Sequence, residues 1–193
     1  MLIRWRIRPN HISVASIAFA AAAGVCFWAS ASQSSHRAWL LVAAAGLIQI
    51  RLLCNLFDGM VAIEGNFRTR SGEIYNELPD RFADALILIG AGYATPRPEW
   101  MPLAGWAATV LALITAYTRA LGVAAGASQH FCGPMAKPHR MAALTLGTLV
   151  GAVLLWLKLD FPIIGWTLVI ISAGCLVTIW RRTSRILRDL ESK

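Results

Sequence analysis

The chain has 193 residues, of which 57% are hydrophobic and only 15% are charged, and its mean hydropathy is +0.58. A soluble domain of this length cannot bury so much apolar surface, so the composition excludes an ordinary soluble protein and favours an integral membrane protein. The formal net charge of +8 does not indicate a nucleic-acid-binding protein, because the chain has no basic-aromatic motif of a known nucleic-acid reader.

Six apolar stretches are long enough to cross a bilayer as helices, which takes about 20 residues each. They cover residues 12–30, 38–57, 77–95, 101–125, 140–158 and 161–180. The third stretch is the least apolar, because its first two turns contain Glu77, Asp80, Arg81 and Asp84. Residues 1–11 alternate apolar and basic side chains up to a break at Pro9-Asn10, and we expect them to lie on the membrane surface. The sequence therefore predicts an all-α integral membrane protein with one domain over residues 1–193, six transmembrane helices and a short interfacial N-terminal segment.

Basic residues predict the orientation of these helices. With six spans both termini lie on one side, which has twelve of the lysines and arginines in the loops, tails and span ends, while the other side has three. The three are Arg37, Arg97 and Lys158. Because basic residues are enriched in cytoplasmic loops, both termini and the segment between the second and third spans are predicted to be cytoplasmic, in the inner membrane of a bacterium.

Acidic residues are concentrated in that cytoplasmic segment. Six of the ten acids in the chain lie between Asp58 and Asp84. A carboxylate beside a bilayer is costly unless a partner neutralises it, and hard divalent cations prefer carboxylate and amide oxygens. The sequence therefore predicts a metal site at the cytoplasmic face of the membrane.

Helical geometry gathers the polar residues of this segment onto two faces. At about 100° per residue, Arg51, Asn55 and Asp58 stack on one face near the end of the second span. On a helix that runs from Gly72 onward, five polar side chains fall within an arc of about 100°. They are Glu73, Asn76, Glu77, Asp80 and Asp84. Two such faces meeting would form an oxygen-rich pocket, and the small residues beside it leave room for a nucleotide.

At these residues the chain resembles the CDP-alcohol phosphotransferase family (CDP-alcohol phosphatidyltransferase class I). The family signature, D-x-x-D-G-x-x-A-R-x8-G-x-x-x-D-x-x-x-D, lies on spans two and three of a six-span fold. The resemblance implies a membrane transferase of phospholipid biosynthesis. Such an enzyme moves a substituted phosphate from a CDP-linked donor, such as CDP-diacylglycerol, to a small alcohol and releases CMP. The resemblance also implies contact with membrane lipids and a homodimer.

The signature assigns roles to individual residues by its spacing. Its four metal-binding positions fall on Asn55, Asp58, Asn76 and Asp80. Its small-residue positions, which we expect to border the nucleotide, fall on Gly59, Ala62 and Gly72. The resemblance implies that Mg²⁺ or Mn²⁺ binds at the first set against the donor pyrophosphate, and that Asp80 deprotonates the attacking hydroxyl. Lys137 and Arg140 resemble a later basic loop of the family, which implies that they bind phosphate.

The chain departs from the signature at three positions. Asparagine stands at positions 55 and 76 instead of aspartate, and Ile63 stands instead of arginine. The formal charge of the four ligand positions falls from −4 to −2, so two adjacent metals become harder to neutralise. An alternative register keeps more charge by taking Asp80 and Asp84 as the last pair, with four extra residues in the loop, and Asp84 is then the candidate general base.

Simpler interpretations of these residues stay open. Asn76, followed by Pro79, is typical of a helix N-cap, and Asp84 has Arg81 and Arg119 as candidate ion-pair partners. For the whole chain, the alternatives are a catalytically degenerate protein that binds nucleotide or lipid, favoured by the two asparagines, and a small ion-coupled transporter. The transporter is disfavoured because the acids gather at one membrane face and not at the midplane.

Overall fold

The computed structural model describes residues 9–32, 34–64, 72–95, 97–159 and 161–192. Within these ranges, the description of side chains leaves out residues 9–13, 34, 58–59, 61–64, 72–73 and 75–76.

Six α-helices and one 3-10 turn make up the described structure. They are α1 (Pro9–Ser32), η2 (Ser34–His36), α2 (Arg37–Glu64), α3 (Gly72–Gly92), α4 (Met101–Ala124), α5 (Lys137–Trp156) and α6 (Ile163–Glu191). Each predicted span corresponds to one of the six α-helices, and no strand occurs among the described residues, so the prediction of an all-α membrane fold is confirmed.

Five of these helices are apolar and long enough to cross a membrane, and α3 is the exception among the described residues. The charges in the first half of α3 lower its hydropathy, as the sequence indicated. Its 21 residues nevertheless extend about 30 Å, which matches the thickness of the hydrocarbon core of a bilayer. Helix α3 is therefore long enough to span, provided that its charged residues find partners inside the protein.

The structure corrects the predicted start of the first span. Helix α1 begins at Pro9, so residues 9–11 form its first turn and there is no break at Pro9-Asn10. Proline fits a first turn because the amide hydrogen that it lacks has no helical acceptor there. The remaining residues of the predicted interfacial segment, 1–8, lie outside the described part of the chain.

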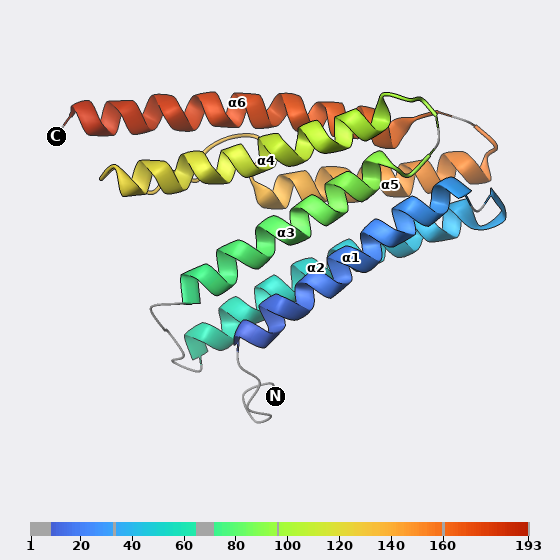
Figure 1. Cartoon of the computed structure of the whole chain (residues 1–193), viewed down its shortest axis with the longest axis horizontal. Coiled ribbons are helices and arrows are strands. Elements are labelled where there is room, and N and C mark those ends of the chain that lie inside the picture. The colour runs from blue at the N-terminus through green and yellow to red at the C-terminus, as the bar shows by residue number, and fades with distance from the viewer. Residues whose placement is uncertain (1–8, 33, 65–71, 96, 160, 193) are drawn as a thin grey trace.

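The helices form two groups that spread apart at one end of the molecule (Figure 1). Helix α1 packs against α2 and α3, α2 packs against α5, and α4 packs against α3 and α6. In Figure 1 the groups α1–α3 and α4–α6 diverge toward the side where α2 ends and α3 begins. The segment that the signature occupies therefore lies at the splayed end of the bundle.

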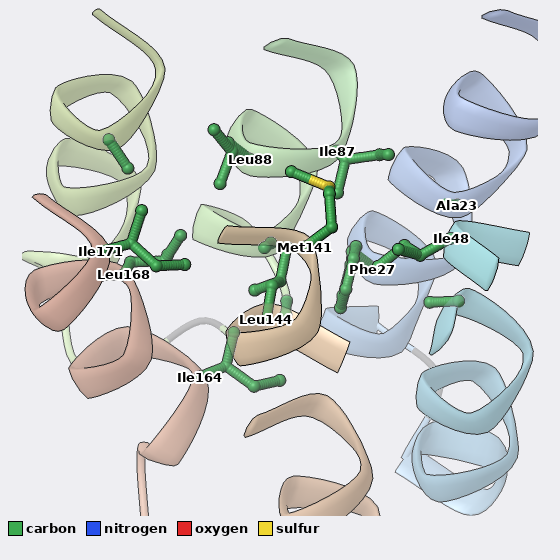
Figure 2. Close-up of a cluster of buried hydrophobic side chains, with 14 of the residues drawn as sticks. Ala23, Phe27, Ile48, Ile87, Leu88, Met141, Leu144, Ile164, Leu168 and Ile171 are labelled. Atoms are coloured by element: carbon green, nitrogen blue, oxygen red, sulfur yellow. The ribbon is translucent and has the colours of Figure 1, made fainter. Parts of the chain in front are cut away.

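A buried apolar cluster joins the two groups (Figure 2). Met141 and Leu144 of α5 lie in this cluster, with Ile87 of α3 and Phe27 of α1 beside Met141. Lipid tails are as apolar as these side chains, so close packing, and not exclusion from water, holds such helices together.

Glycine allows α1 and α3 to touch through their backbones. A Cβ added at Gly90 would lie 2.5 Å from the Cα of Gly24, and one added at Gly24 would lie 2.8 Å from the carbonyl oxygen of Leu86. Helix α3 meets α4 in the same way, since a Cβ at Gly105 would lie 2.9 Å from the Cα of Gly92. These contacts fix the second half of α3 between its neighbours.

Replacing Gly90 by alanine should therefore push α1 and α3 apart. We expect Gly90→Ala to lower the free energy of unfolding by about 1–3 kcal/mol, the usual cost of overpacking. The measurement is unfolding of the detergent-solubilised protein followed by tryptophan fluorescence. Gly46→Ala is the matched control, because a Cβ at that helical glycine meets nothing within 4 Å. Equal stability of the two variants would contradict the close contact.

Candidate active site

A buried arginine links α2 to the acidic half of α3. The side chain of Arg51 is fully buried, and its Nη2 lies 3.1 Å from Oδ1 of Asp80 and 2.8 Å from Oδ1 of Asp84. Both acids are themselves buried, with side chains 7% and 4% exposed. Asp80 and Asp84 are four residues apart on α3, so they stack on one helical face and one guanidinium reaches both.

Asp80 is the most heavily contacted acid of the site. Its Oδ1 accepts a hydrogen bond of 2.6 Å from Nδ2 of Asn55, in addition to the bond from Arg51. Its Oδ2 forms an ion pair with Nζ of Lys137, in the first turn of α5. Asp80 therefore joins α2, α3 and α5, and the signature positions of Asn55 and Asp80 meet in space.

Asp84 has a different set of partners on its second oxygen. Oδ2 of Asp84 accepts a bond of 3.0 Å from Nη2 of Arg140, whose side chain is almost fully buried. Nη1 of Arg140 donates to Oγ1 of Thr115 at 3.2 Å and to the carbonyl oxygen of Met135 at 2.9 Å. Both carboxylate oxygens of Asp84 are thus bonded to guanidinium groups, so Asp84 links α2 to α5.

A second ion-pair group surrounds Glu77, one turn nearer the start of α3. Nη2 of Arg119 lies 2.6 Å from one oxygen of Glu77, and Nη2 of Arg81 lies 3.2 Å from the other. The guanidinium of Arg119 also lies over the ring of Phe131, 5.1 Å from its centroid. This group is partly exposed, so it forms the outer part of the site.

The sequence did not identify Arg182 as part of this region. Predicted to be a tail residue beyond the last span, it lies within α6, which continues to Glu191. Its guanidinium is buried and donates to the carbonyl oxygens of Thr115 at 2.7 Å and Cys132 at 3.0 Å. Arg182 thereby fixes the loop before α5, and the signal available in the sequence was only its position two residues past the apolar run.

Positive charge exceeds negative charge among the described residues of this network. Six cationic side chains accompany three carboxylates, an excess of three positive charges. The cations are Arg51, Arg81, Arg119, Lys137, Arg140 and Arg182, and the acids are Glu77, Asp80 and Asp84. Among the described residues, Nε and Nη1 of Arg51 and Nε of Arg140 are buried without a hydrogen-bond partner. Such a site favours an anionic ligand.

The structure brings together some of the predicted site residues and says nothing about others. Arg51 and Asn55 share a face of α2, and Asp80, Asp84, Lys137 and Arg140 converge on them. The side chains of the remaining predicted site residues are outside the described part of the structure, so their roles stay predictions. These residues are Asp58, Gly59, Ala62, Gly72 and Asn76.

Two of the simpler interpretations do not hold. Helix α3 begins at Gly72, so Asn76 lies inside the helix and is not its N-cap. Asp84 pairs with Arg51 and Arg140, while Arg81 and Arg119 pair with Glu77. The contact between Asn55 and Asp80 favours the register that makes Asp80, and not Asp84, the last residue of the signature.

The oxygen donors at this place fit a hard divalent cation. Nδ2 of Asn55 donates to Oδ1 of Asp80 at 2.6 Å, and the same amide has a carbonyl oxygen. An amide oxygen and a carboxylate beside each other are suitable ligands for one hard cation. Among the described residues, no group of three histidine, cysteine or acidic side chains is assembled for a metal.

Comparison with known proteins identifies the class of protein to which this fold and site belong. The family model of CDP-alcohol phosphatidyltransferase matches residues 6–180. The chain belongs to the CDP-alcohol phosphatidyltransferase family, so it is an enzyme, a membrane transferase of phospholipid biosynthesis. Among curated proteins no sequence match was found.

Solved structures of phosphatidylinositol phosphate synthase (PgsA1) from Mycobacterium tuberculosis have the same fold. The structure in complex with manganese and citrate has a TM-score of 0.80 and 18% identity, covering 96% of this chain and 85% of that chain. The structure with CDP-DAG bound has a TM-score of 0.79 and 19% identity, covering 96% and 89%. The apo form has a TM-score of 0.77 and 18% identity, covering 96% and 92%.

Removing the guanidinium of Arg51 should leave two buried carboxylates short of positive charge. We expect Arg51→Met to lower the free energy of unfolding by about 3–5 kcal/mol, the usual cost of breaking a buried ion pair. The measurement is denaturant unfolding in detergent. Arg81→Met is the control, because its pair with the partly exposed Glu77 should contribute no more than about 1 kcal/mol. An Arg51→Met protein as stable as the control would show that the bridge does not hold the site together.

Proposed function

We propose that this enzyme transfers a phosphatidyl group from CDP-diacylglycerol to an alcohol and releases CMP. The observation on which the proposal rests is the meeting of Asn55 and Asp80, the first and last ligand positions of the signature, beside Lys137. This meeting joins α2, α3 and α5 at the splayed end of the bundle, where the described side chains have an excess of positive charge.

The donor is proposed from charge and from the structural neighbours. A CDP-linked lipid has an anionic pyrophosphate and two acyl chains, which suits a cationic site in a membrane-spanning bundle. One structure of the M. tuberculosis synthase is described with CDP-DAG bound, which supports the same donor for this chain. The acceptor is proposed only as an alcohol, and the homodimer stays a prediction.

We place the divalent cation, Mg²⁺ or Mn²⁺, at Asn55, Asp58, Asn76 and Asp80. The manganese in another structure of the synthase supports a divalent cation in a protein of this fold. When bound, the cation neutralises the pyrophosphate and makes its phosphorus a better electrophile. Lys137 and Arg140, at the start of α5, are proposed to hold and orient the phosphates, with no contribution to proton transfer.

Asp80 is the proposed proton acceptor. Arg51 and Asn55 hold its Oδ1 and Lys137 pairs with its Oδ2, so the carboxylate is fixed in orientation. The hydroxyl oxygen of the acceptor attacks the phosphorus that bears the diacylglycerol, and its proton passes to Asp80. The bond from that phosphorus to the bridging oxygen breaks, and CMP leaves with the oxygen. Positioning of this kind is a principal source of rate in phosphoryl transfer.

The proposed orientation puts the site and both termini in the cytoplasm of a bacterial cell. The distribution of basic residues supports it, with twelve in the loops, tails and span ends on that side and three on the other.

Asp80→Asn tests the proposed reaction. We expect release of CMP from CDP-diacylglycerol, offered with a panel of alcohol acceptors, to fall about 100-fold or more, because general-base catalysis typically contributes about 10²–10⁴-fold. Asp189→Asn is the control, since that acid lies on α6 and contacts Ser128 and His130 of the loop between α4 and α5, away from Asp80. Turnover in Asp80→Asn equal to that of the control would refute Asp80 as the base. No CMP release by the wild type with any acceptor would refute the proposed reaction.

Removal of the cation offers a separate test. We expect EDTA to abolish CMP release and added Mg²⁺ or Mn²⁺ to restore it, because the pyrophosphate needs a counter-cation in the transition state. The measurement is a CMP-release assay after chelation and dialysis. Full activity after chelation would show that the reaction needs no divalent cation.

A further inference from the structure

The ligand positions of this site have half the negative charge that the family signature provides. Asparagine at 55 and 76 leaves Asp58 and Asp80 as the two charged members of the set. Four carboxylates balance two divalent cations, whereas two carboxylates balance one. The chain therefore needs either substitute acids or fewer metal ions.

Asp84 is not free to act as a substitute acid. Its Oδ1 lies 2.8 Å from Nη2 of Arg51 and its Oδ2 lies 3.0 Å from Nη2 of Arg140, and its side chain is 4% exposed. A cation at Asp84 would have to displace a buried guanidinium, which is costly because the displaced charge would lose its partner. Glu77 is similarly engaged, with one oxygen on Arg119 and the other on Arg81.

Lys137 already provides a positive charge at the remaining described carboxylate. Its ammonium forms an ion pair with Oδ2 of Asp80, and it comes from the first turn of α5, at the side of Asp80 opposite the hydrogen bonds from Arg51 and Asn55 to Oδ1. An ammonium has three N–H donors, so it can contact the carboxylate and a phosphate oxygen at the same time. A divalent cation that bridges a carboxylate to a phosphate neutralises charge in the same way.

Asn55 contributes to the same arrangement. As a neutral amide it donates to Asp80 at 2.6 Å, whereas an aspartate at this position would repel Asp80 unless a cation lay between them. The amide and the lysine together therefore make the pocket around Asp80 stable with one cation fewer.

We propose that this site binds a single divalent cation and that the ammonium of Lys137 supplies the second positive charge, linking Asp80 to the phosphate of the donor. This inference rests on the proposed function, because it assumes that the donor pyrophosphate and one metal ion occupy the site.

The test is the stoichiometry of Mn²⁺ on the full chain in detergent, measured by equilibrium dialysis and by electron paramagnetic resonance. We expect one Mn²⁺ per wild-type chain, with a spectrum free of coupling between metal ions. In the variant with Asn55→Asp, Asn76→Asp and Lys137→Met we expect two, with coupling between neighbouring ions. Lys137→Met alone should bind its one Mn²⁺ about tenfold more tightly, since a competing positive charge is gone.

Lys158→Met is the matched control, because that lysine lies just beyond the other end of α5 and should leave Mn²⁺ binding unchanged. Should the triple variant fail to fold, the wild-type stoichiometry and the affinity of Lys137→Met against Lys158→Met still decide the question. Two coupled Mn²⁺ ions on the wild type would overturn this inference and leave the proposed reaction intact. A wild-type chain that binds no Mn²⁺ and still releases CMP would overturn the inference and the metal assignment. A wild-type chain that neither binds Mn²⁺ nor releases CMP would overturn the proposed function.

Discussion

The guanidinium of Arg51 between Asp80 and Asp84 is the interaction on which the rest of this site depends. A fully buried arginine in a membrane helix needs acidic partners, and acids in α3 need cations for the same reason. The mutual requirement fixes how α2 faces α3. With Oδ1 of both acids held by Arg51, their second oxygens are directed to α5, where Lys137 and Arg140 bind them.

Helix α3 combines two kinds of packing along its length. Its second half contacts α1 and α4 through glycines, at distances that no added Cβ would tolerate. Its first half instead contacts its neighbours through long basic side chains from α2, α4 and α5. The close contacts hold the helix rigidly, and the helix groups spread apart at the end where the charged residues lie (Figure 1). A rigidly held helix beside a group of charged side chains is suitable for holding a phosphate-bearing substrate.

The contacts of Asp80 give the departure from the family signature at Asn55 a structural role. Considered alone, two amides in place of aspartates suggest a weakened metal site. In the structure, Asn55 donates a hydrogen bond to Asp80, and Lys137 pairs with the oxygen that Asn55 leaves free. The amide hydrogen bond and the ammonium group both stabilise the negative charge of Asp80.

Several features followed from the sequence by itself, because they depend on local rules. Hydrophobic length predicted the six helices, and the spacing of four residues predicted that Arg51 stacks with Asn55 and Asp80 with Asp84. The signature spacing predicted the family. Only the tertiary structure decided which acid pairs with which cation: Asp84 lies with Arg51 and Arg140, not with Arg81 or Arg119, and Arg182 reaches the loop before α5 from a helix that continues past its apolar run. Such pairings depend on how far long side chains extend across the spaces between helices, and no spacing along the chain specifies that distance.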